Sequence, residues 1–79
     1  MIKYIWDLFL TTGKGDIKIA SIEACEYSDA LLECSSYMAQ YRLSLVKSVR
    51  EHELSRTYYL TFMQDATTIK GKLVERSND

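Results

Sequence analysis

The sequence predicts an α+β domain in which one long helix packs on a four-stranded antiparallel sheet. Three observations lead to this prediction. Two segments near the start alternate between apolar and polar residues, a central stretch without glycine or proline has apolar residues at helical spacing, and two more alternating segments follow it. Period-two alternation is typical of half-buried strands, and spacings of three and four are typical of amphipathic helices. The expected order of elements is therefore ββαββ.

The first two strands are predicted over residues 2–11 and 17–24, joined by a turn that contains two glycines. In the first strand, Trp6 and the other even-numbered apolar residues share one face. In the second strand the apolar register slips, because Ile19 is odd-numbered and Ile22 is even-numbered. A β-bulge near residues 20–21 would bring both onto one face.

The helix is predicted over residues 28–53, a range without glycine or proline. Acidic residues lie near its start and basic residues near its end, as the helix dipole favours. Its sheet-facing stripe consists of Ala30, Leu31, Cys34, Met38, Tyr41, Leu45 and Val49.

The last two strands are predicted over residues 56–64 and 69–74, with Tyr58, Leu60 and Phe62 on one face. A right-handed connection through the helix places the first strand between the second and the third, which gives the antiparallel order 2-1-3-4. Residues 1–76 are expected to form one domain, and residues 77–79 a polar tail.

Composition narrows the classes of function. The chain of 79 residues carries 10 Lys and Arg against 11 Asp and Glu, a net charge of -1. This balance argues against both a strongly basic DNA-binding domain and an acidic DNA mimic. No signal peptide or membrane-spanning run is visible and only two cysteines are present, so we expect a cytoplasmic protein with reduced thiols. So small a domain is marginal alone, which favours a homodimer or a complex.

No catalytic constellation can be assembled from the sequence. His52 is the one histidine, which leaves a zinc site without enough ligands. Cys34 falls on the apolar stripe and is expected to be a core residue, while Cys25 precedes the helix. The segment Gly13-Lys14-Gly15 joins two strands and lacks the spacing of a phosphate-binding loop. We therefore expect no enzyme, no metal and no cofactor.

Two candidate interaction surfaces remain. The first is a second apolar stripe on the predicted helix, directed away from the sheet and flanked by basic residues. Apolar residues on the outer side of a surface helix suggest an interface with a protein partner or a second copy. This surface consists of Leu32, Ala39, Leu43 and Val46, with Lys47 and Arg50 at its rim.

The second surface is the sheet face turned away from the helix. Its alternation places aromatic side chains among lysines, an arrangement with which RRM-like domains stack single-stranded nucleic acid. The residues concerned are Phe9, Lys18, Tyr59, Lys70 and Lys72. Single-stranded nucleic acid is therefore the alternative ligand.

The segment Ile22-Glu23-Ala24-Cys25-Glu26-Tyr27-Ser28-Asp29-Ala30-Leu31 closes a strand and opens a helix. It resembles the strand-to-helix junction of small phage-encoded inhibitors, among them a short phage protein that blocks bacterial RNA polymerase and a short type I-F anti-CRISPR protein. Glu26 departs from the Ser or Thr expected at the cap, and no functional residue carries over. The resemblance implies a phage-encoded, anti-CRISPR-like protein that acts in the host cytoplasm.

The sequence as a whole thus predicts a non-catalytic binding protein. It would inhibit or modulate a larger host protein by covering a surface on it, as a homodimer.

Overall fold

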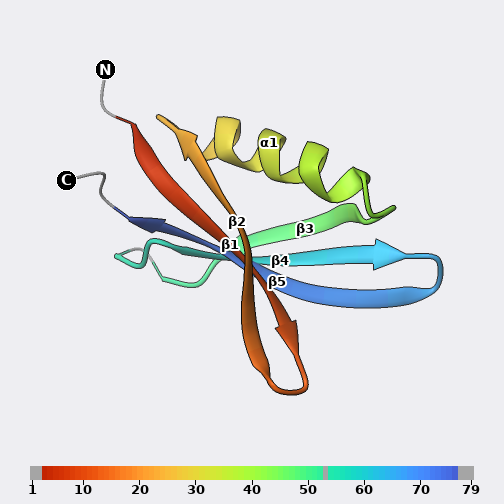
Figure 1. The fold of residues 1–79 in the computed structure, drawn as a ribbon. Helices are drawn as coiled ribbons and strands as arrows, with labels where there is room; N and C mark the ends of the chain where they lie inside the picture. The colour runs from red at the N-terminus through yellow and green to blue at the C-terminus, as the bar shows by residue number, and fades with distance from the viewer. Residues whose placement is uncertain (1–2, 53, 77–79) are drawn as a thin grey trace.

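The computed structural model describes residues 3–52 and 54–76. Within these residues, one helix and five strands form an α+β fold (Figure 1). The elements follow one another as β1 (Tyr4–Thr12), β2 (Gly15–Ala24), α1 (Tyr27–Ala39), β3 (Ser44–Arg50), β4 (Thr57–Gln64) and β5 (Thr67–Arg76). The predicted tail at residues 77–79 lies outside the described residues.

The predicted four-stranded sheet with one long helix is wrong. The sheet has five strands in the order β2-β1-β5-β4-β3, and all neighbours are antiparallel. The helix leaves edge strand β2 and leads to β3 at the opposite edge. Because β3 then pairs with β4, the last strand β5 is left to pair with β1 at the centre. The predicted order 2-1-3-4 had instead placed residues 56–64 beside the first strand.

The helix ends at Ala39, although neither glycine nor proline stops it. Arg42 adopts a left-handed conformation with a φ of 62°. The amide of Leu43 then donates to the carbonyl of Met38, and the amide of Arg42 donates to the carbonyl of Ala39. These two bonds form a Schellman motif, which satisfies the last carbonyls of the helix and turns the chain back toward the sheet. Residues 44–50 can therefore form a strand, where the sequence had predicted helix.

The core lies between α1 and one face of the sheet. From the helix, Ala30, Cys34 and Met38 are buried against it. Trp6 is buried as its strand parity predicted, and its indole N–H donates to the carbonyl of Ala24 at 3.1 Å. The remaining buried apolar side chains are Leu8, Ile22, Ala24, Leu43, Leu60, Phe62 and Leu73.

The predicted bulge is present one residue earlier than expected. Leu8 pairs with Ala20 and Phe9 pairs with Lys18, so Ile19 has no partner in the β1–β2 register. This shift brings both halves of β2 into a single inward register, which explains the slip in the sequence pattern.

The sheet divides into two diverging hairpins beyond its centre (Figure 1). Pairing between β1 and β5 stops at Leu10 and Gly71. Gly71 permits the close approach there, because a Cβ atom on it would lie 2.7 Å from the carbonyl oxygen of Phe9. Past this point, the β1–β2 and β4–β5 hairpins point in different directions.

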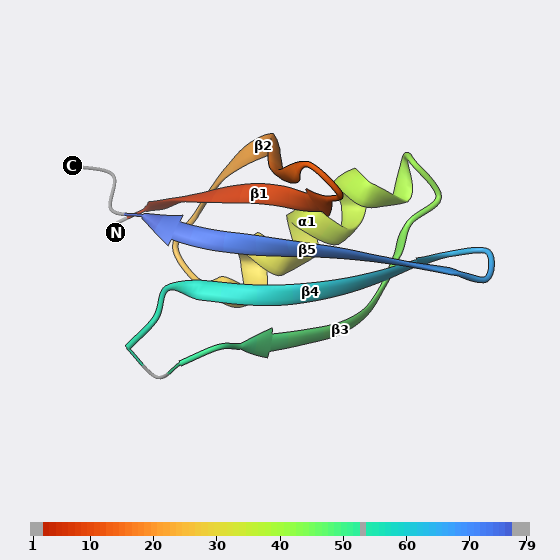
Figure 2. The same ribbon diagram turned by 90° about the horizontal axis from the view of Figure 1, so that it is seen from below.

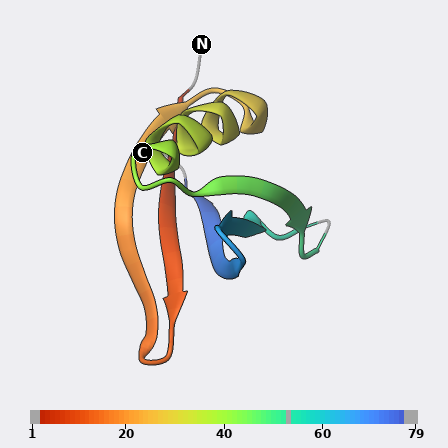
Figure 3. The same ribbon diagram turned by 90° about the vertical axis from the view of Figure 1, so that its right-hand side faces the viewer.

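The helix covers one face of this twisted sheet, and the other face is left open. Figure 2 shows the five strands with α1 behind them, and Figure 3 shows the sheet curling around the helix. In the part of the chain that the structure describes, no second helix covers the opposite face. We call it the open face. No helix among the described residues is long and apolar enough to cross a membrane.

Candidate binding surface

One row of side chains crosses the open face from edge to edge. Cross-strand partners in a sheet point to the same face. Starting from Phe9, the register pairs link five strands in a single line. From β2 to β3, this central row consists of Lys18, Phe9, Lys72, Tyr59 and Val49. Aromatic and aliphatic side chains therefore lie between and beside two lysines.

Lys72 is at the centre of this row. Its ammonium group lies 5.5 Å from the ring centroid of Phe9, within the range of a cation–π contact. It also forms an ion pair with Asp16 at 2.8 Å. Hydrogen bonding to Asp16 raises the pKa of Lys72. The ammonium group of Lys72 therefore stays charged, but it already contacts the ring of Phe9 and the carboxylate of Asp16.

Asp7 fixes three strands at the next row of the open face. Its carboxylate accepts hydrogen bonds from Arg76 Nε and from Ser21 Oγ, both at 2.7 Å. Lys18 Nζ lies 3.6 Å away. The hydrogen bond from Arg76 lowers the pKa of Asp7, with smaller contributions from Ser21 and Lys18, against the opposing effect of burial. Because Asp7 is only 7% exposed, this cluster serves to hold β1, β2 and β5 in place.

The two sides of the domain differ in charge. On the open face the strand register places five basic side chains, Lys18, Lys47, Lys70, Lys72 and Arg76, against three acidic ones, Asp7, Asp16 and Glu23. The difference is +2 (five minus three). On the helix side, Glu26, Asp29 and Glu33 lie in or beside α1, and α1 itself carries no basic residue. The paired strands of the open face are therefore more basic than α1, although Arg50, which pairs with Tyr58, adds a positive charge on the helix side.

The structure places all residues of the predicted nucleic-acid surface on this open face. Phe9, Lys18, Tyr59 and Lys72 stand in the central row, and Lys70 is in the adjacent row opposite Thr61. Three of the five cations, however, are ion-paired: Lys18 and Arg76 with Asp7, and Lys72 with Asp16. Only part of the positive charge is therefore available to a ligand.

The predicted apolar stripe on the helix does not exist as one surface. Leu32 is 72% exposed on the outer side of α1, and Ala39 is the last helical residue. Leu43 follows the helix and is buried in the core with 6% exposed, so the expectation that it is directed away from the sheet was wrong. The Schellman motif is the cause, because it directs Leu43 inward beside Met38.

The rest of that predicted set lies on the edge strand β3. Val46 is skipped in the register between Leu45 and Lys47, so it occupies a bulge, and it is 61% exposed. Lys47 and Arg50 are exposed on the same strand. Val49, also on β3, contributes to the central row of the open face. β3 therefore extends the apolar part of the open face to the edge of the sheet.

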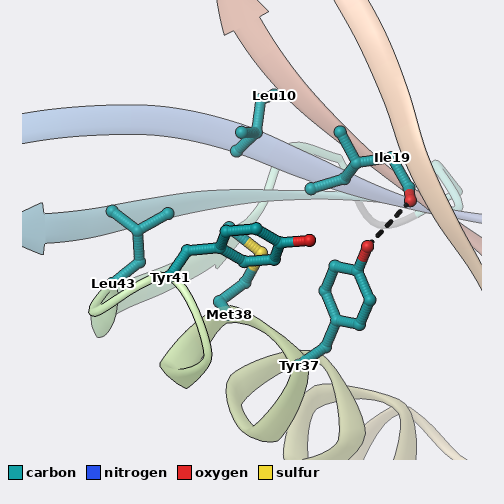
Figure 4. Close-up of a pocket in the computed structure, with 6 residues that line it drawn as sticks. All are labelled: Leu10, Ile19, Tyr37, Met38, Tyr41 and Leu43. Atoms are coloured by element: carbon teal, nitrogen blue, oxygen red, sulfur yellow. Dashed lines mark hydrogen bonds between the residues drawn. The ribbon is translucent and has the colours of Figure 1, made fainter.

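An apolar cleft lies on the other side of the sheet, at the C-terminal end of α1 (Figure 4). Leu10 and Ile19 come from β1 and β2, Tyr37 and Met38 come from α1, and the chain beyond the helix completes the lining with Tyr41 and Leu43. The hydroxyl of Tyr37 donates to the carbonyl of Ile19 at 3.3 Å. The sequence offered no signal for this cleft, because three separate elements form it.

The histidine and the two cysteines lie in different parts of the described chain. His52 Nδ1 accepts a hydrogen bond from the backbone amide of Leu54, in the connection between β3 and β4 rather than at a helix end. Cys34 is fully buried, and burial raises the pKa of its thiol to about 11. Cys25 and Cys34 are both free thiols. Across residues 3–52 and 54–76, no group of three His, Cys, Asp or Glu residues is placed to hold a metal ion.

Comparison with protein-family models, with curated proteins and with solved structures yielded no match to this chain.

Proposed function

We propose that this chain is a non-catalytic binding protein that covers a surface of a larger protein with its open sheet face. The observation that carries the proposal is the central row, in which Phe9, Tyr59 and Val49 stand among charges on a face that no described helix covers. Tyr59 is 45% exposed although it lies in the middle of a strand. Aromatic anchors surrounded by polar groups are typical of protein interfaces.

The ion pairs favour a protein partner over a polyanion. Binding to phosphates gains free energy by releasing counterions, which requires cations that are not already paired. On the open face, Asp7 and Asp16 already form ion pairs with three of the five cations. Such pairs instead supply rigid, pre-oriented charges, which contribute to specificity in a protein interface. The remaining positive charge favours a partner with an acidic surface.

The dimensions of the sheet support a modest interface. Five strands at about 4.8 Å and paired segments of about six residues at ~3.3 Å give a face of roughly 24 by 20 Å, or about 500 Å². A standard interface buries about 800 Å² on each partner. The exposed side chain of Val46 and its neighbours on β3 would supply part of the difference. The proposed binding site therefore includes both the open face and the β3 edge.

The test compares two matched double variants. Val49→Ala with Tyr59→Ala removes an aliphatic and an aromatic side chain from the open face. Leu32→Ala with Tyr41→Ala removes the same chemistry from exposed positions on the helix side. Tagged forms would capture partners from nuclease-treated lysate of cells that express the protein. The wild type and the helix-side variant should capture the same partner protein. The open-face variant should capture at least about tenfold less of it. Retention by the open-face variant and loss by the helix-side variant would contradict the proposal.

A single-stranded nucleic acid is the second candidate ligand. Phe9 and Tyr59 lie on strands separated only by β5, and Lys72 stands between them, so two bases could stack on either side of a cation. Anisotropy of a labelled oligothymidylate, titrated at low and at physiological salt, tests this function. Salt-dependent binding that Phe9→Ala with Tyr59→Ala abolishes would favour this candidate over a protein partner.

A further inference from the structure

The apolar cleft at the end of α1 has no part in the proposed function. It faces the helix side, whereas Tyr59 and the central row face away from it. Its volume is about 380 Å³. That volume lies at the lower end of the range of small-molecule sites.

The cleft exists because two structural features coincide. The left-handed turn at Arg42 ends the helix above this part of the sheet, so no further helical turn covers it. The β1–β2 hairpin also diverges from β5 beyond Leu10, so no neighbouring strand closes that side. Leu10 and Ile19 therefore remain partly exposed on the inward side of the hairpin. An occupant would bury their apolar surface without any rearrangement of the backbone.

The lining determines the chemistry of the occupant. None of the six lining residues is charged, so an ionic ligand would lose its hydration without gaining an ion pair. Tyr37 is a neutral phenol at physiological pH, since tyrosine ordinarily has a pKa of about 10 and the Tyr41 side chain and burial raise it further. The hydroxyl of Tyr37 is already engaged with the carbonyl of Ile19. A neutral molecule is therefore favoured.

The lining also favours a ring over a flexible chain. The rings of Tyr37 and Tyr41 have centroids 5.7 Å apart and are tilted by 52°, which offers an occupant both a face and an edge. Met38 also lines the cleft, as Figure 4 shows, and so offers its sulfur to an occupant. Sulfur atoms make favourable contacts with aromatic rings. We propose that this cleft binds a small, neutral aromatic molecule between the end of α1 and the β1–β2 hairpin.

The experiment uses N-phenyl-1-naphthylamine, an uncharged aromatic fluorophore. Wild-type protein should give a saturable increase in its fluorescence. Ile19→Phe fills the cleft, and Ile5→Phe makes the same change on the open face of β1, outside the cleft. Ile19→Phe should weaken binding by at least about tenfold, and Ile5→Phe should leave it within about twofold. Trp6 emission and circular dichroism would establish that both variants fold.

A second variant covers the case in which Ile19→Phe does not fold. Tyr41 is 54% exposed, so Tyr41→Ala should preserve the fold while removing one aromatic wall and weakening binding of the fluorophore. The open-face variant Val49→Ala with Tyr59→Ala should bind the fluorophore as wild type does, which separates this site from the proposed protein interface. A wild type without saturable binding, or equal binding by both phenylalanine variants, would overturn the inference.

Discussion

Arg42 ends α1 in a left-handed conformation, with a φ of 62°. In that conformation a Cβ atom costs about 1–2 kcal/mol, because it approaches the following carbonyl oxygen. Replacing Arg42 by glycine removes this cost but adds about 0.5–1 kcal/mol of backbone entropy to the unfolded chain. The Arg42→Gly variant should therefore be more stable than wild type by about 0.5–1 kcal/mol. For a domain of this size, that change raises the melting temperature by roughly 2–8 °C.

The assay is urea unfolding followed by Trp6 fluorescence, since Trp6 is buried in the core. Arg42→Ala is the matched control, because it removes the same side chain and charge but keeps the Cβ atom. Arg42→Ala should stay near wild type, and Arg42→Gly should exceed both. If residue 42 instead lay inside a helix, glycine would lower stability by about 1 kcal/mol. A destabilised Arg42→Gly variant would therefore refute the assignment of the Schellman motif.

Three further predictions concern the sheet and the core. Gly71→Ala should lower the free energy of unfolding by about 1–3 kcal/mol in a urea titration, because its new Cβ atom would meet the carbonyl of Phe9. Asp7→Asn should cost about 1–2 kcal/mol at pH 7 through the weakened bond to Arg76. Because the folded-state pKa of Asp7 is lowered, this difference should be constant above about pH 4 and shrink as the pH falls through that lowered value. Equal stability of Asp7→Asn and wild type at pH 7 would contradict the assigned role. Leu43→Glu should lower the free energy of unfolding by about 3 kcal/mol or more in a thermal denaturation, since it buries an uncompensated charge. A variant as stable as wild type would show that Leu43 is not a core residue.

The inward and outward faces of β1 and β4 could be predicted from alternation alone. Trp6 and Leu8 point inward on β1, and Leu60 and Phe62 do so on β4. The slip in β2 correctly indicated a bulge, which lies at Ile19. These predictions are correct because a strand with one buried face must place its apolar residues at every second position.

The third strand could not be predicted, because its apolar residues fit both periodicities. Tyr41, Leu45 and Val49 are spaced by four, which continues the helical stripe. The bulge at Val46 breaks the alternation that would have revealed a strand. The helix stop was hidden as well, since Arg42 occupies the left-handed position where glycine is usual. The error in the helix then produced the error in the sheet order.

Of the candidate surfaces, those that depend on strand alternation could be predicted, and those that depend on the length of the helix could not. The open face depends on strand parity, so its aromatic and basic residues could be named from the sequence. Its ion pairs could not, because Asp7 and Arg76 are joined only when β1 pairs with β5. The helix stripe failed because it depended on helical geometry beyond Ala39. The cleft could not be foreseen, since it depends on where the helix ends and where the hairpins diverge.

Site-specific photo-crosslinking inside the expressing cell tests most directly whether the open face is the binding surface. Benzoylphenylalanine would replace Tyr59 on the open face in one variant and Leu32 on the outer side of α1 in another. We expect one dominant protein adduct at position 59 that resists nuclease, and no matching adduct at position 32. An adduct between two copies of this chain at position 59 would identify the open face as a homodimer interface and contradict a larger partner. Adducts at position 32 alone, or adducts at position 59 that nuclease removes, would contradict the central claim.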